Sequence, residues 1–500
     1  MSSLDVTINR SRFGAVVGVV LALGACSLGP NYKRPDIPPP AQWSGAGPVA
    51  DPAAAMWPSA DWWRAFNSPE LNELIAEARG ANDDLAAAIA RVDEADAQAQ
   101  VAGAALLPSV GAGVGADRAR GRSSISGAGG STGTAGTVNA VSNPPTYNLF
   151  ASTLTATYEL DFWGKYRALH DAARMAAAAS RYDRGTVELT VMTGVANTYF
   201  QVLELRDRLR VAQRNLASAQ STLDDLRTEE QVGTATALEV AQQATTVATL
   251  SAVVPPLQEQ LQQATDALAI LVGKEPEALS ITSGTLADLA EPRVSPGLPS
   301  ALLARRPDVA SAEAQLQEAN ANIRAARAAF FPSISLTAEG GIASTALGTA
   351  LNPAHRIFEV GGGLTQPIFA GGALKGQYRY TKARYTELLA NYHKAVISAF
   401  GNVEDALAAV RRSAELLQRQ QQAVDTARDA YELSQDQLAG GTVNILAVLN
   451  TETALFTAED ALVQAKYSHL SSLVTLFNAL GGGWQQQGQD PGVRTVARFP

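Results

Sequence analysis

The sequence is poor in the residues from which most chemical sites are built. It contains one cysteine and four histidines in 500 residues, so it can form neither an internal disulfide framework nor a cysteine-cluster zinc site. The histidines are far apart and lack HExxH spacing, and no Walker P-loop occurs. We therefore expect a protein that is not an enzyme, without a metal or a non-covalent cofactor.

Aromatic and charged residues are also scarce, at 6% and 17% of the chain. The 39 basic and 48 acidic side chains give a net charge of −9, and no long Lys/Arg run supplies the basic face of a nucleic-acid binder. Much of the 46% hydrophobic content is alanine, which forms helices well but fills cores poorly. This composition favours long, closely packed helices.

The single cysteine follows a segment with the layout of a secretion signal. Residues 1–25 contain a short basic region and an apolar stretch that is too short to span a bilayer as a helix. Residues 23–26 read Leu-Gly-Ala-Cys, which resembles the lipobox of bacterial lipoproteins. We expect Cys26 to carry acyl lipid such as palmitate, with an ordinary signal peptide as the alternative. Residues 26–60, rich in proline, glycine and alanine, predict an extended tether.

The remainder of the chain is internally duplicated. Leu-Pro-Ser-Val at 107–110 returns as Phe-Pro-Ser-Ile at 331–334, and further along a constant offset of 208 relates Gly164 to Gly372, Gly233 to Gly441, and Gly273 to Gly481. The first repeat covers residues 61–290, the second covers 291–483, and a tail follows at 484–500. The extra residues of the first repeat include a Gly/Ser-rich tract at 121–136, which predicts a surface loop.

Each repeat predicts the same series of elements: a helix, two strands, a long helix and a return helix. The long helices contain no proline and would each span about 100 Å. Pro255-Pro256 predicts a break or kink in the first return helix. The predicted helices are 82–106, 165–231 and 235–271 in the first repeat, and 308–329, 373–439 and 443–480 in the second.

The predicted strands alternate between apolar and polar residues. Their length of about ten residues and their pattern are typical of transmembrane barrel strands, although a soluble β-sandwich edge gives the same alternation. Four strands cannot close such a barrel, and an open edge is not tolerated in lipid. Three copies would supply twelve strands. The apolar positions are Val110, Ala112, Val114 and Ala116; Phe150, Leu154, Ala156, Tyr158 and Leu160; Ile334, Leu336 and Ala338; and Phe358, Val360 and Leu364.

Apolar residues recur every seven positions on the long helices, which predicts knobs-into-holes packing. A soluble coiled-coil bundle is the alternative reading. The repeating positions are Val202, Leu209, Leu216 and Leu223 in the first repeat and Val410, Leu417, Val424 and Tyr431 in the second, flanked by Ala212, Ala219, Ala423 and Ala430.

Four motifs carry a family resemblance that covers nearly the whole mature chain. They are GPNYKRP at 29–35, DWWRAF at 61–66, RRPDV at 305–309 and AAFFPSI at 328–334. Together they resemble the TolC-like outer membrane factor family, in its branch of RND-type efflux lipoproteins. The resemblance implies an α+β membrane protein: a homotrimeric 12-stranded β-barrel with four strands per chain, continued by a long α-helical periplasmic barrel. Its location would be the Gram-negative outer membrane.

The resemblance further implies a passive exit duct for small molecules. The partners would be a periplasmic adaptor (membrane fusion) protein, an inner-membrane RND pump and outer-membrane lipid. A type I protein-secretion duct is an alternative within the same class. A non-porous structural coiled-coil lipoprotein is an alternative of another class, although a spacer of that kind needs no strands.

The resemblance also assigns roles near the two turns between long and return helices. Leu446 and Asn450 match positions that narrow the periplasmic gate in related channels, where the second is often an aspartate. Asparagine there puts an anionic ring in doubt, and Leu446 could instead be a core residue. The turns themselves would contact the adaptor, through Val232, Gly233, Thr234, Gly440, Gly441 and Thr442.

Overall fold

The computed structural model describes residues 32–40, 43–44, 57–120, 146–281, 284–292, 294 and 299–484. Cys26 and the tract at 121–136 lie outside these residues. The chain forms two compact units. Unit 1 comprises Met1–Lys33, Ala95–Ala176 and Gln317–Glu387, and unit 2 comprises Arg34–Glu94, Ala177–Leu316 and Leu388–Pro500. Each unit therefore draws on both sequence repeats.

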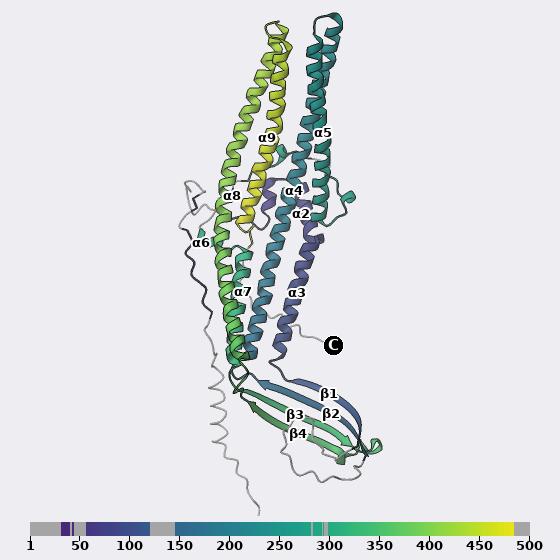
Figure 1. Ribbon diagram of the computed structural model, residues 1–500, viewed down its shortest axis with the longest axis vertical. Coiled ribbons are helices and arrows are strands. Elements are labelled where there is room, and N and C mark those ends of the chain that lie inside the picture. The colour runs from purple at the N-terminus through teal and green to yellow at the C-terminus, as the bar shows by residue number, and fades with distance from the viewer. Residues whose placement is uncertain are drawn as a thin grey trace, which may run out of the picture. The chain divides into compact units, whose positions relative to one another are not determined.

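The helices agree with the predicted ones to within about two residues at most ends (Figure 1). The two long helices, α4 and α8, contain 68 and 67 residues, about 100 Å each. Among the described residues, none of the helices has both the length and the apolar character to cross a membrane. The helices are α2 (Pro69–Ala81), α3 (Asp83–Ala104), α4 (Lys165–Val232), α5 (Ala237–Val272), α6 (Pro299–Leu302), α7 (Pro307–Ala328), α8 (Ala373–Ala439) and α9 (Ile445–Ala479).

In unit 1, the four strands form one antiparallel sheet in the order β1-β2-β3-β4. The strands are β1 (Ser109–Arg120), β2 (Thr146–Leu160), β3 (Ser333–Ser344) and β4 (Arg356–Thr365). Sequence neighbours are therefore also neighbours in the sheet, and the central pair, β2 and β3, joins the two repeats. The outer edges belong to β1 and β4.

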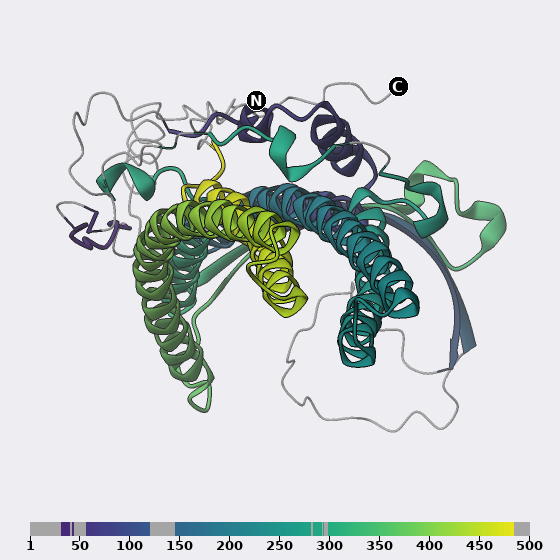
Figure 2. The same cartoon turned by 90° about the horizontal axis from the view of Figure 1, so that it is seen from above.

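In unit 2, the helices pair into two hairpins, α4 with α5 and α8 with α9, seen side by side in Figures 1 and 2. An aromatic cluster packs against α4 and the C-terminal end of α9. Trp62 stacks on Phe477 with ring centroids 5.0 Å apart, and Phe66 meets Phe200 edge-on at 5.0 Å. Trp62, Phe66 and Phe200 are all fully buried. These aromatic residues thus supply large buried side chains to the core of unit 2.

The duplication is preserved in three dimensions. Gly273 and Gly481, which end α5 and α9, have φ of +81° and +86°, in the left-handed region where glycine is favoured. A Cβ atom at these glycines would collide with the carbonyl oxygens of Ala81 and Arg305, respectively. The same close backbone approach is therefore built twice.

Of the predicted break or kink at Pro255-Pro256, the break is wrong, because α5 runs without interruption from Ala237 to Val272. Proline fixes φ near the helical value, so its cost in a helix is mainly the lost N–H donor and steric strain. Buried Leu257 and Leu268 on the same helix pack into the core and offset that cost.

None of the eight heptad positions on the two long helices is exposed, as the predicted knobs-into-holes packing requires. The flanking alanines differ: Ala219 is fully buried, whereas Ala423 and Ala430 are exposed. The flanking alanine at 219 is therefore packed in α4, whereas the two alanines of α8 are not packed within the described chain.

The tether is only partly as predicted. Residues 32–40 have no regular secondary structure, but the part of the tether that begins at Arg34 packs within unit 2. Trp43 is buried with its ring 6.1 Å from that of Phe400, while Arg34 donates to the Tyr392 hydroxyl at 3.2 Å and pairs with Glu313 at 3.1 Å. A tryptophan and an arginine in a proline-rich stretch are the sequence signal that such a segment packs.

Candidate functional site

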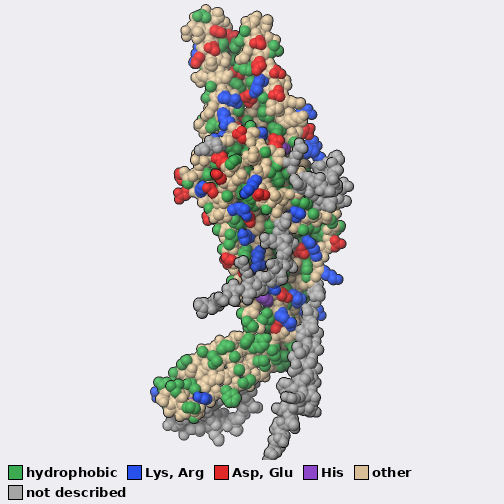
Figure 3. Space-filling view, turned by 180° about the vertical axis from the view of Figure 1, so that it is seen from behind, with side chains coloured by type: hydrophobic (Ala, Val, Ile, Leu, Met, Phe, Trp, Pro, Cys, Tyr) green, Lys and Arg blue, Asp and Glu red, His purple; other side chains and the backbone are tan. Residues whose placement is uncertain are grey.

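The register of the sheet places the predicted apolar positions of all four strands on one face. Ala112 pairs with Leu154, Leu154 with Gly340, and Gly340 with Phe358, so these residues form one row across the sheet. Val114 and Phe358 are each 88% exposed. Figure 3 shows hydrophobic side chains gathered over the sheet. A face of this kind suits hydrocarbon better than water.

The opposite face is polar and rich in small residues. The same register aligns Thr157 with Thr337 and Glu339 with Glu359. Serine, threonine and glycine fill most of the remaining positions of this face, and they can border water without desolvation cost. The sheet therefore has one lipid-compatible face and one water-compatible face.

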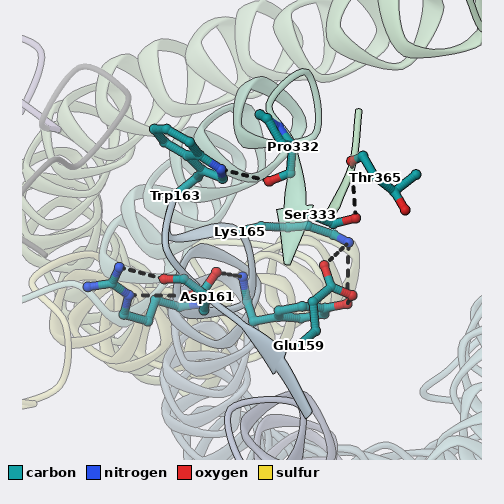
Figure 4. Close-up of polar contacts among 9 residues, drawn as sticks. Glu159, Asp161, Trp163, Lys165, Pro332, Ser333 and Thr365 are labelled. Carbon is teal, nitrogen blue, oxygen red and sulfur yellow. Dashed lines mark hydrogen bonds and ion pairs between the residues drawn. The ribbon is translucent and has the colours of Figure 1, made fainter. Parts of the chain in front are cut away.

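Aromatic residues mark the end of the sheet where strands give way to helices (Figure 4). The Trp163 Nε1 atom donates to the Pro332 carbonyl oxygen at 2.8 Å, and its ring stacks on Phe331 with centroids 4.8 Å apart. Phe162 meets Trp163 edge-on at 5.0 Å. Rings at the ends of barrel strands are typical of the boundary between membrane and water.

Polar contacts fix the connection between β2 and α4 at the same level (Figure 4). The Asp161 carboxylate accepts hydrogen bonds from the backbone N–H groups of Tyr166 (3.0 Å) and Arg167 (2.9 Å), and so caps the positive end of α4. Lys165 pairs with Glu159 at 3.6 Å. The long helix therefore leaves the sheet in a defined direction.

The two helical turns have the same geometry. In the first turn, the Thr234 N–H donates to the Glu229 carbonyl oxygen at 2.9 Å, and the Thr234 hydroxyl donates to the same oxygen at 3.1 Å. In the second, Thr442 makes both bonds to the Gln437 carbonyl oxygen, at 2.9 and 3.0 Å. Glycine-threonine pairs at both turns thus have a clear structural reason.

The turn residues are also exposed. Gly233 and Gly441 have φ of +83° and +71°, which reverses the chain after each long helix. The described chain leaves Val232 73% exposed, and Leu238, at the start of α5, is 67% exposed. The first hairpin tip therefore presents apolar side chains at its surface.

The two predicted gate residues lie one turn apart on α9 and are both exposed. Leu446 is 41% exposed, whereas its neighbours Val448 and Leu449 are each 5% exposed and form the packed side of the helix. Asn444 begins α9 by accepting a hydrogen bond from the Ala447 N–H at 3.3 Å. Leu446 is therefore not a core residue of this chain.

A buried carboxyl lies on the packed side of α9 close behind them. Glu452 is 1% exposed and accepts a hydrogen bond from the Ser218 hydroxyl of α4 at 2.9 Å. Burial raises the pKa of the Glu452 carboxyl. The sequence analysis missed this contact, although a glutamate spaced four and three residues from the apolar Val448 and Leu455 is a signal for it.

A second polar contact also links α4 to α9. The Arg208 guanidinium donates to Asp460 of α9 at 2.7 Å and to Glu204 of its own helix at 3.2 Å. The α8–α9 hairpin is thus tied to α4 at two levels. Within the described part of the chain, no cluster of three or more histidine, cysteine, aspartate or glutamate side chains could hold a metal ion.

Comparison with known proteins was made by family, by sequence and by structure. The model of the family described as "Outer membrane efflux protein" matches residues 74–274 and 298–482. The chain is 39% identical to the pyoverdine export outer membrane protein OpmQ of Pseudomonas aeruginosa over 476 residues, which cover 95% of this chain and 98% of OpmQ. It is 30% identical to the probable outer membrane lipoprotein SilC of Salmonella typhimurium, covering 93% and 97% of the two chains.

Among solved structures, the chain resembles the CmeC outer membrane channel of Campylobacter jejuni. The TM-score is 0.84 at 25% identity, covering 92% of this chain and 96% of CmeC. Together with the four antiparallel strands and the duplicated hairpins, this likeness confirms the fold class that the sequence predicts.

Proposed function

This chain belongs to the outer membrane efflux protein family and is an outer-membrane channel component of an efflux system, and from that premise we propose that three copies form one passive exit duct for small molecules. The sheet carries this proposal. It has a lipid-compatible face and a water-compatible face, but within the described chain its outer strands, β1 and β4, have no further partner. Joining β4 of one copy to β1 of the next would close twelve strands and remove every open edge.

The helical hairpins would continue this duct through the periplasm. We propose that their exposed tips, at residues 232–234 and 440–442, contact a periplasmic adaptor protein that links the duct to an inner-membrane RND pump. The apolar Val232 at a tip is the kind of side chain that anchors such an interface. The duct itself would use no cofactor and catalyse no reaction, since the pump supplies the energy.

The periplasmic end of the duct would be narrowed by Leu446 and Asn450. Both side chains are exposed on one side of α9, while buried Glu452 on the other side of that helix contacts Ser218 of α4. Three Leu446 side chains would form an apolar constriction, and three asparagine amides could hydrogen-bond to one another. Asparagine carries no charge, so this constriction would lack the anionic ring that an aspartate would form.

We also propose that Cys26 is lipidated and that residues 26–60 connect this anchor to two structural repeats at 61–290 and 291–483. The similar protein SilC is named an outer membrane lipoprotein, which supports the anchor. OpmQ is named for the export of pyoverdine, which supports a small-molecule cargo over a secreted protein.

Cross-linking tests the closure of the sheet edges. Cysteines replacing Ala112 in β1 and Val360 in β4 lie on the same face of the sheet, and a short thiol-reactive cross-linker should join neighbouring copies into a ladder that ends at three. The single variants Ala112→Cys and Val360→Cys are the matched controls and should not reach three. Monomers alone in the membrane fraction of the double variant would reject the proposed assembly.

A further inference from the structure

Unit 1 contains a cavity of about 230 Å³ between the first turns of α4 and the last turns of α7. Asp171 and Arg174 border it from α4, Asn320 and Arg324 border it from α7, and Tyr32 of the tether completes it. The proposed export function assigns no role to this cavity. It combines charged, amide and hydroxyl groups, which is the composition of a binding site rather than of a packing defect.

The side chains that border the cavity carry more positive than negative charge. Arg324 donates through one terminal nitrogen to Asp171 at 3.0 Å, but its Nε atom is buried and has no hydrogen-bond partner in the described chain. Arg174 is exposed, and within the described part of the chain no carboxylate pairs with it. Two guanidinium groups therefore face one carboxylate, and one buried N–H is directed at no acceptor.

Both guanidinium groups belong to residues that line the cavity. A phosphate group there would suit them, since its oxygens accept several charge-assisted hydrogen bonds from arginine at once. Buried Asn320 and the tether residue Tyr32 line the same space. The donor set thus matches a phosphate better than a cation or an apolar ligand.

The position of the cavity along α4 indicates the molecule that supplies the phosphate. The aromatic residues Trp163 and Phe331 mark the membrane boundary immediately before α4 and β3. Arg174 lies nine residues into α4, which begins at Lys165, so it is about 14 Å along the helix. Side chains on a helix lean toward its N-terminus, which for α4 is the end at the sheet. Arg174 therefore reaches back toward the level at which phospholipid headgroups lie.

We propose that this cavity binds the phosphate of an anionic phospholipid headgroup in the periplasmic leaflet of the outer membrane. Arg174 and Arg324 hold the phosphate oxygens, and Asp171 fixes the Arg324 guanidinium. One bound lipid per copy joins α4, α7 and the tether just beneath the sheet. This site is separate from the export path and from the covalent lipid proposed at Cys26.

The test titrates the purified full-length protein in detergent with short-chain phosphatidylglycerol, short-chain phosphatidylethanolamine or inorganic phosphate, and counts bound molecules by native mass spectrometry. The unaltered protein should bind phosphatidylglycerol, and the affinity of the Arg174→Gln/Arg324→Gln variant for this lipid should be lower by about tenfold or more. Arg91→Gln is the matched control, because Arg91 is an exposed helical arginine far from the cavity in the sequence. The affinity of this variant for phosphatidylglycerol should stay unchanged.

Two further arms separate the remaining outcomes. Arg174→Gln alone keeps the Asp171–Arg324 pair and should still weaken binding, which excludes misfolding as the cause. Inorganic phosphate that binds as tightly as the lipid would overturn the lipid assignment, and equal lipid affinity of the double variant and the unaltered protein would overturn the site itself. Oligomer mass and conductance of the same preparations report separately on the proposed duct.

Discussion

Glu452 is the side chain whose burial has the clearest consequence for this protein. A carboxyl in the space between α4 and α9 loses water, and its contacts there are the neutral hydroxyls of Ser218 from α4 and Tyr431 from α8. No cation compensates its charge among these contacts. Burial therefore raises the pKa of this carboxyl, and we expect the contact between the two hairpins to depend on pH.

This burial predicts how stability depends on pH. Because the pKa of Glu452 is raised in the folded state above its ordinary value of 4.5, the stability that it contributes is present below that value and is lost as the pH rises through the folded pKa. Glu452→Gln should therefore melt higher than the unaltered protein at pH 7.5, by on the order of a few degrees, and the two should converge near pH 4. A variant that melts lower than the unaltered protein at pH 7.5 and converges with it near pH 4 would show that the ionised carboxylate stabilises the contact.

The gate assignment leads to a prediction at Leu446. Removing most of this exposed side chain should widen the proposed constriction without opening a cavity in the core, since the buried neighbours Val448 and Leu449 remain. Leu446→Ala should raise the leak conductance several-fold at unchanged melting temperature. Leu238→Ala, at the equivalent position of the first repeat, is the matched control and should change conductance less. Equal conductance of Leu446→Ala and the unaltered protein would reject the assignment.

At the scale of elements, local sequence signals predict the helices well because their ends are decided locally. Glycines at 233, 273, 441 and 481 reverse the chain or end a helix wherever they occur, and alternating strands need only a pattern of period two. The pairing of β2 with β3 could not be predicted, because it joins segments from different repeats. The uninterrupted course of α5 could not be predicted either, because its tertiary packing overrides two prolines. The Ser218–Glu452 contact could not be predicted because it depends on the facing helix.

The duplicated glycine at the end of each return helix gives a prediction for stability. Gly481→Ala places a side chain at φ +86°, which costs about 1–2 kcal/mol, and its Cβ atom would collide with the Arg305 carbonyl oxygen. The melting temperature should fall clearly. Gly376→Ala is the control: this exposed glycine lies in α8 with nothing near its Cβ position, so the change should stabilise by up to about 1 kcal/mol. Equal melting temperatures of the two variants would contradict the account of the close approach.

At the scale of the whole molecule, the sequence motifs and the duplication predict the family, and the family comparison confirms it. The sheet explains why a single copy cannot function: its apolar face is exposed and its outer strands lack neighbours within the described chain. One chain thus indicates its assembly only through its exposed apolar surface and its unpaired strand edges. The proposed trimer, adaptor contact and gate all follow from surfaces of this kind.

Single-channel recording tests the central proposal most directly. The purified protein, inserted into a planar bilayer, should give discrete conductance steps, with current per step increased by Leu446→Ala. Proline in place of Thr155 in the central strand β2 removes a ladder hydrogen bond, so that control should give few or no steps while its helical circular dichroism is retained. Intact, membrane-inserted protein that produces no conductance steps would contradict the exit duct.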